Sequence, residues 1–118
     1  MSSPVHLPPV ADLTELARNA TFEGALWSAQ SPDLNANLIV LEKRGIDEHV
    51  NNEVDVLVVG IFGVGTVTID GVAQRLGVGQ VVLIPRGARR GFRPTESRFA
   101  YLTCHRRRSG LWPTPPKS

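Results

Sequence analysis

The sequence predicts an all-β domain, a small sandwich or barrel of short strands preceded by one short helix. Three observations support this fold class. Most of the chain beyond residue 24 consists of short segments rich in aliphatic and β-branched residues, which is typical of strands. Glycine, proline and aspartate separate these segments as turn signals. A helical pattern occurs near the N-terminus. The other segments amount to seven or eight short strands in about 85 residues, a number typical of a sandwich or barrel.

The helix is predicted over residues 12–19. Asp12 is a favourable N-cap, and Glu15 follows it three residues later as in a capping box. The apolar face of this helix would consist of Leu13, Leu16 and Ala17. Because the helix is short, we expect it to pack on a larger element.

The strands are predicted from apolar runs and from the turns between them. Asp70-Gly71 is the clearest hairpin turn, since both central positions of this turn type need positive φ. Further turns are predicted at residues 31–33, 44–45 and 86–87. The predicted strands cover residues 25–30, 37–43, 54–62, 65–70, 72–76, 80–85, 90–93 and 99–106.

Two of these segments are apolar on both faces. Residues 56–59 read Val-Leu-Val-Val, and residues 81–84 read Val-Val-Leu-Ile. A strand of this kind lies between the domain interior and a second layer, such as another subunit. We therefore expect a homodimer.

Length and composition favour one soluble domain. The chain has 118 residues with a single cysteine, Cys104, so no intramolecular disulfide is expected. The N-terminus has neither a basic leader nor an apolar run of signal-peptide length, which favours the cytoplasm. No apolar stretch approaches the roughly 20 residues that span a bilayer, so we expect no membrane role.

Charge is distributed unevenly along the chain. Residues 1–74 carry ten acidic and three basic side chains, whereas residues 75–118 carry ten basic side chains and one acidic one. These charges are scattered through apolar segments, so we expect the halves to neutralise each other across a shared sheet. The run His105–Arg108 is interpreted as a solvated strand end or a dimer contact. We expect no nucleic-acid partner, because few aromatic residues accompany the basic ones.

The segment from Gly79 to Pro94 reads GQVVLIPRGARRGFRP. It predicts a turn, a buried strand, and a rigid second turn at Pro85 and Gly87. Arg90 follows three residues after Gly87, in a fixed position relative to that turn. It belongs to a group of four arginines in eight positions, Arg86, Arg89, Arg90 and Arg93.

This segment resembles the second motif of the cupin superfamily, G-x5-P-x-G-x2-H-x3-N. Gly79, Pro85 and Gly87 match it, Arg90 occupies the histidine position, and Pro94 occupies the asparagine position. Residues 45–63 are similar to the first cupin motif, G-x5-H-x-H-x3-4-E-x6-G.

Within the first motif, His49 takes the first histidine position, although only three residues separate it from Gly45. Asn51 replaces the second histidine. The glutamate position falls on Asp55 or Val56, depending on the direction of counting.

The resemblance, over about residues 36–105, implies a jelly-roll barrel with the motif residues pointing into one open end. We expect residues 1–22 to form an arm with the helix, residues 23–108 the cupin barrel, and residues 109–118 a proline-rich tail in which Trp112 either docks or is disordered. Metal-binding cupins usually offer three histidines and a glutamate. Here the motif positions keep one histidine, and Arg90 is a cation without an acceptor lone pair. We therefore favour no cofactor; if a divalent metal binds, its ligands would be His49, Asn51 and Asp55.

Two roles for Arg90 remain open. It could form an internal ion pair with Glu53 or Asp55. Alternatively, it holds the carboxylate or phosphate of a small anionic or polar ligand, in a site with His49, Asn51, Glu53, Asp55, Arg90 and Tyr101. The sequence thus predicts a small-molecule-binding cupin. The alternative is a cupin-type enzyme: a metal-dependent oxygenase or isomerase with a reduced ligand set, or a metal-free, epimerase-like enzyme in which His49 is the candidate catalytic base.

Overall fold

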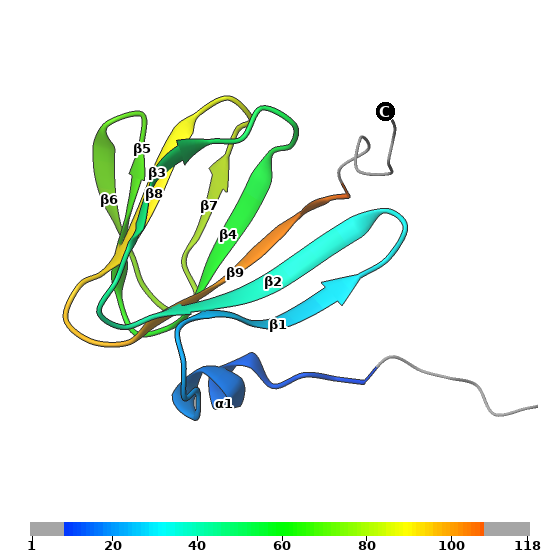
Figure 1. Cartoon of the computed structure of the whole chain (residues 1–118), viewed down its shortest axis with the longest axis vertical. Helices are drawn as coiled ribbons and strands as arrows, with labels where there is room; N and C mark the ends of the chain where they lie inside the picture. The colour runs from blue at the N-terminus through cyan, green and yellow to red at the C-terminus, as the bar shows by residue number, and fades with distance from the viewer. Residues whose placement is uncertain (1–8, 108–118) are drawn as a thin grey trace, which may run out of the picture.

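Two facing antiparallel sheets form the domain, as Figure 1 shows for the computed structural model, which describes residues 9–107. The strand order is β1-β2-β9-β4-β7 in the five-stranded sheet and β3-β8-β5-β6 in the four-stranded sheet. This arrangement confirms the predicted all-β jelly roll with one short helix. The strands are β1 Gly24–Gln30, β2 Leu34–Leu41, β3 Ile46–Val50, β4 Val56–Phe62, β5 Gly65–Ile69, β6 Val72–Leu76, β7 Val81–Ile84, β8 Arg89–Pro94 and β9 Phe99–Arg106.

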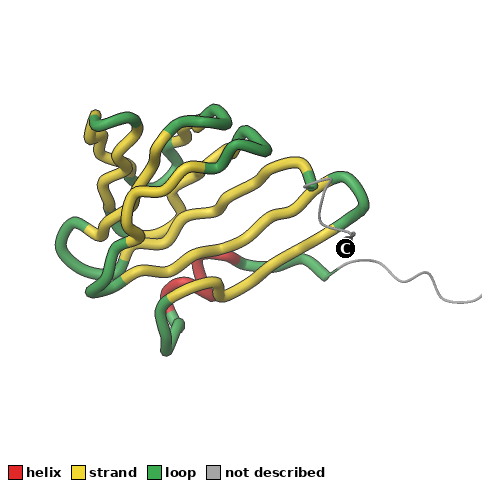
Figure 2. Tube along the Cα trace, turned by 45° about the horizontal axis from the view of Figure 1, so that its top comes forward, coloured by secondary structure: helices red, strands yellow, loops and turns green. Residues whose placement is uncertain are grey.

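The helix α1, Leu13–Arg18, begins and ends close to the predicted positions. The Asp12 carboxylate caps it by accepting a hydrogen bond of 3.1 Å from the backbone N–H of Glu15. Figure 2 shows the helix beside the five-stranded sheet, where Ala17 is fully buried in a cluster with residues of β2 and β9, namely Leu38, Val40 and Ala100. Leu16, which the sequence predicts on the apolar face, is instead exposed.

Two strands differ from the sequence prediction. Strand β2 begins at Leu34, because the Ser31 hydroxyl accepts hydrogen bonds from the N–H groups of Asp33 and Leu34 and so completes a tight turn. Strand β3 was not among the predicted strands. Its residues are mostly polar and exposed, since it is an edge strand that pairs only with β8. An edge strand of this kind lacks the alternation that marks a half-buried strand.

The Asp70-Gly71 hairpin forms as predicted. Both residues have positive φ, 49° and 83°, which is the requirement of this turn type. The Asp70 carboxylate also accepts a hydrogen bond of 2.9 Å from the N–H of Arg89. The turn is therefore tied to β8, the strand that carries Arg90.

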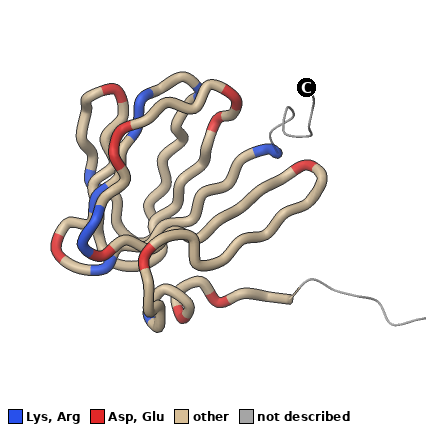
Figure 3. Tube along the Cα trace, in the orientation of Figure 1, with Lys and Arg blue, Asp and Glu red and all other residues tan. Residues whose placement is uncertain are grey.

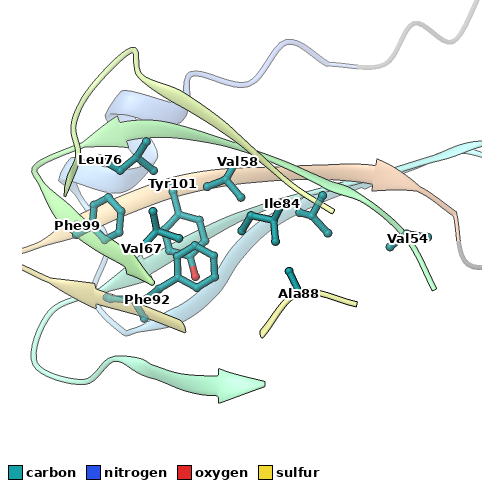
Figure 4. Close-up of a cluster of buried hydrophobic side chains, with 11 residues drawn as sticks. Val54, Val58, Val67, Leu76, Ile84, Ala88, Phe92, Phe99 and Tyr101 are labelled. Carbon is teal, nitrogen blue, oxygen red and sulfur yellow. The ribbon is translucent and has the colours of Figure 1, made fainter. Parts of the chain in front are cut away.

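The core lies between the two sheets (Figure 4). Tyr101 stacks on Phe92 with ring centroids 4.5 Å apart and lies at a tilt to Phe99 at 5.2 Å. Because Phe92 comes from β8 and Tyr101 from β9, this stack joins the two sheets. Aromatic pairs in this geometry stabilise a core beyond their buried area alone.

Ion pairs join the acidic and basic halves of the chain. Arg98 pairs with Glu42 at 2.6 Å, and Arg93 lies 3.7 Å from Asp47. Arg98 also donates to the carbonyls of Ala17 and Arg18 at the end of α1. Figure 3 shows that basic and acidic residues are interspersed along the backbone, in agreement with mutual neutralisation of the acidic and basic halves of the chain.

Candidate functional site

A cavity of about 210 Å³ opens between the two sheets. It receives side chains from both sheets. Six of its lining residues are polar and six are apolar or aromatic. The lining residues are Asn37, Ile39, Ile46, His49, Asn51, Val56, Ile84, Arg90, Phe92, Tyr101, Thr103 and His105.

The rim of this cavity consists of two polar cross-strand pairs. His49 of β3 lies opposite Arg90 of β8. In the facing sheet, Asn37 of β2 lies opposite Thr103 of β9. His105 follows two residues after Thr103, on the same face of β9, because alternate residues of a strand share a face. The rim therefore carries cationic, amide, hydroxyl and imidazole groups.

The floor consists of two further cross-strand pairs. Ile46 lies opposite Phe92 in one sheet, and Ile39 lies opposite Tyr101 in the other. Burial raises the pKa of the Tyr101 phenol far above its ordinary value of 10.0, so its hydroxyl stays neutral at any physiological pH. A fifth pair, Val56 and Ile84, contributes an apolar side wall.

Arg90 is the buried charged residue of the described chain, with 3% of its surface exposed. Its Nε donates to the carbonyl of Ala88 at 2.9 Å, and one terminal nitrogen donates to the carbonyl of Pro85 at 3.2 Å. Both acceptors belong to the turn between β7 and β8, in which the N–H of Ala88 also donates to the carbonyl of Pro85. Gly87 has a φ of 87° in this turn. The proline and glycine of the second motif thus shape the backbone that holds the arginine.

The two histidines of the cavity have their tautomers set by backbone carbonyls. Nδ1 of His49 lies 3.0 Å from the carbonyl oxygen of Asp47, and Nδ1 of His105 lies 2.8 Å from that of Arg106. A carbonyl oxygen can only accept, so Nδ1 carries the proton in both rings. In the neutral ring, Nε2 is then the acceptor and the potential base.

Asn51 and Asp55 tie the loop after β3 to the turn before β8. The Asn51 side-chain oxygen accepts hydrogen bonds from the N–H groups of Glu53 and Val54. The backbone carbonyl of Asn51 accepts a hydrogen bond of 2.7 Å from the N–H of Gly87. The Asp55 carboxylate accepts one of 2.8 Å from the N–H of Arg86. These contacts hold the two motif loops together at the mouth of the cavity.

The structure brings together four of the six predicted ligand-binding residues. His49, Asn51, Arg90 and Tyr101 line the cavity, whereas Glu53 and Asp55 are exposed and lie outside its lining. The carboxylates turn outward because residues 51–55 form a loop and not a continuous strand, so the alternation assumed for them does not apply.

Asn37 and Thr103 of the polar rim were not predicted as site residues, and His105 was predicted as part of a solvated strand end or a dimer contact. Alternation along β9 from Tyr101 identifies Thr103 and His105 as residues of the same face. Asn37 carries no local signal of this kind. Its position depends on the pairing of β2 with β9, two segments far apart in the chain.

The residues at the cupin motif positions do not fit a metal ion. The oxygen of Asn51 already accepts two backbone hydrogen bonds, the Asp55 carboxylate lies outside the cavity, and Arg90 is cationic. Among residues 9–107, no group of three or more histidine, cysteine, aspartate or glutamate side chains is arranged to hold a metal. The acceptor set of a metal-binding cupin is thus not assembled here.

Comparisons with known structures show the same fold. A Thermus thermophilus protein is 23% identical with a TM-score of 0.70, and the match covers 85% of this chain and 98% of that one. A protein with a cupin-2 domain from Shewanella frigidimarina is 16% identical with a TM-score of 0.61, covering 73% and 85%. A Klebsiella pneumoniae protein with a double-stranded β-helix domain is 13% identical with a TM-score of 0.68, covering 85% and 90%. The sequence matches no family model and no curated protein.

The two facing sheets and these neighbours define the fold: the described residues form a small all-β jelly roll of the cupin type. Its cavity lies at the open end of the barrel, between the two motif segments. Within residues 9–107, no helix has the length and apolar character needed to cross a membrane.

Proposed function

We propose that this cupin-type domain binds a small anion, a carboxylate or a phosphate, in the cavity at the open end of the barrel. The protein would act in the cytoplasm, which its single cysteine favours. One observation carries the proposal: the cavity lining includes a buried arginine and two histidines but no acidic side chain.

The charge of this lining favours an anion over a cation or a neutral ligand. Charges interact more strongly in a partly enclosed site than in bulk water. A guanidinium stays charged at any physiological pH and attracts a carboxylate or phosphate group. The Arg90 hydrogen bonds to Ala88 and Pro85 support the proposal in a second way, because they hold its charge at the rim.

A thermal-shift screen of carboxylates and sugar phosphates tests this proposal. Binding to the folded state raises the melting temperature, so at least one anion should stabilise the protein. Arg90→Gln should abolish that shift, whereas Arg90→Lys, which retains the charge, should keep part of it. Arg93→Gln, which removes an exposed arginine from the same strand, is the matched control. The proposal fails if no anion stabilises the protein or if the shift in folded Arg90→Gln equals that of the wild type.

A metal-free enzyme is the second candidate function. It is supported by the two histidines, whose Nδ1–H groups are committed to backbone carbonyls so that Nε2 is the potential base. An enzyme of this type would exchange a proton next to the carbonyl of a bound ligand. NMR detection of deuterium exchange in D2O, lost in His49→Gln, would support it; no exchange with any bound carbonyl compound would favour binding alone.

The protein would act as a homodimer through the outer face of β4 and β7. Leu57, Val81 and Leu83 on this face are 41%, 58% and 59% exposed. Strand β7 is also an edge of the five-stranded sheet. A second copy would bury these side chains and protect that edge.

A further inference from the structure

The geometry of the cavity points to a specific class of anion: a small acid with an apolar body, bound with its apolar end on the Phe92–Tyr101 floor and its charged end at the His49–Arg90 rim. This inference rests on the proposed function, because it assumes that the cavity binds an anion. It adds the orientation of the ligand and the chemistry of the part that carries no charge.

The first argument is that the lining is segregated by depth. Successive pairs along the same strands change from polar to apolar, from His49–Arg90 to Ile46–Phe92 in one sheet and from Asn37–Thr103 to Ile39–Tyr101 in the other. Exposure falls in the same direction along β9, where His105 and Thr103 are partly buried while Tyr101 and Phe99 are fully buried, and along β3, where His49 is exposed and Ile46 partly buried. On β8, Arg90 and Phe92 are both buried, at 3% and 6% exposure. A ligand therefore meets polar groups at the mouth, the buried guanidinium next to them, and hydrocarbon beyond.

The second argument concerns the hydrogen bonds that a ligand would lose. Ile39, Ile46 and Phe92 have no side-chain polar atom, and Tyr101 offers a single neutral hydroxyl. A polyhydroxylated ligand would place several hydroxyl groups on this floor, each deprived of water and left without a partner. Such unsatisfied groups are costly. An aliphatic or aromatic body would instead gain from leaving water.

The third argument is size. The cavity of about 210 Å³ exceeds the roughly 150 Å³ of an apolar cavity that accepts benzene. It therefore accommodates one aromatic ring or a short branched chain, with the carboxylate at the rim. The Val56–Ile84 pair adds an apolar wall beside that body. A larger amphipathic acid would protrude from the mouth.

A ligand series provides the test. We would measure affinities by NMR titration or calorimetry for straight and branched monocarboxylates from acetate to hexanoate, for benzoate, and for the hydroxylated acids glycerate and gluconate. We expect affinity to rise by about fourfold per buried methylene until the cavity is filled, and benzoate to bind more tightly than gluconate. Ile39→Thr, with a hydroxyl on the floor, should flatten this dependence. Ile39→Val, whose side chain has the same shape as threonine without the hydroxyl, should keep most of it.

The outcomes separate this inference from the proposed function. If glycerate and gluconate bind as tightly as apolar acids of equal size, or if the series shows no chain-length dependence, the apolar-body inference is wrong although the anion site stands. If no acid binds at all, the proposed function itself fails. If Ile39→Thr and Ile39→Val respond alike to chain length, the floor does not contact the ligand and the proposed orientation is wrong.

Discussion

His49 and Arg90 lie directly opposite each other in the β3–β8 pair, yet His49 is exposed at the cavity mouth while Arg90 is buried. The pair joins the two cupin-like motif segments, because His49 belongs to the first and Arg90 to the second. The backbone of Asp47 holds the imidazole, and the Pro85–Ala88 turn holds the guanidinium. The rim therefore presents a guanidinium and an imidazole side by side, each held in place by backbone carbonyls.

Replacing either rim histidine by glutamine should weaken anion binding moderately. Because Nδ1–H of each ring already donates to a backbone carbonyl, an imidazole donates to a bound anion from Nε2 in its doubly protonated form. Loss of such a bond corresponds to about 0.5–1.5 kcal/mol, or roughly two- to tenfold in affinity. Titration of His49→Gln and His105→Gln with the best anion from the thermal-shift screen measures the effect. Unchanged affinity in both variants would place the ligand away from the rim.

The sequence was informative wherever glycine and proline restrict the backbone. The turn at Pro85 and Gly87 and the Asp70-Gly71 hairpin were predictable because their φ angles suit only a few residue types. The spacing of these turns, together with the strand pattern, predicted a sandwich or barrel, and the resemblance to the two cupin motifs implied the jelly roll.

The candidate site was predictable only in part. Arg90 and His49 occupy motif positions, but Asn37 reaches the cavity only through the long-range pairing of β2 with β9. No local pattern encodes that register. Glu53 and Asp55 were placed in the site by assuming strand alternation, and the intervening loop breaks that alternation.

Gly87→Ala should destabilise the domain and disturb the cavity together. Its φ of 87° lies in the left-handed region, where a side chain costs about 1–2 kcal/mol. Its N–H also donates to the carbonyl of Asn51, which lines the cavity. Urea unfolding should show this loss for Gly87→Ala and little change for Gly77→Ala, whose added Cβ would lie 3.4 Å from Gln80 Oε1. Equal stability of the two variants would contradict the role of the turn.

Glu23 should make the domain more stable at neutral pH than in acid. Its carboxylate accepts hydrogen bonds from the N–H groups of Glu42, Lys43 and Arg44. These bonds, with that to Glu42 as the largest cause, lower the pKa of Glu23 below its ordinary value of 4.5. A lowered folded-state pKa stabilises the fold above pH 4.5, and this contribution is lost as pH falls through the folded-state value.

Glu23→Gln should therefore show a smaller loss of stability between neutral pH and acid than the wild type. The free energy of unfolding in urea, measured at several pH values, gives the comparison. Glu96→Gln, which changes an exposed carboxylate elsewhere, should follow the wild-type curve. Parallel curves for Glu23→Gln and the wild type would show that the three hydrogen bonds do not control the acid response.

Leu83→Glu should convert the proposed homodimer to a monomer. Leu83 lies on the exposed outer face of the edge strand β7, and Cys104 lies on the same face of the sheet, opposite Leu57 in the β4–β9 pair. A charge there would be buried without a partner in a dimer, which is costly. Sedimentation velocity should show half the wild-type mass for Leu83→Glu. Val72→Glu, which places the same charge on the exposed edge of the other sheet, should leave the mass unchanged.

Thiol modification of Cys104 should also be faster in the Leu83→Glu monomer. A wild-type monomer, or equal thiol rates in both proteins, would show that this face stays open to solvent.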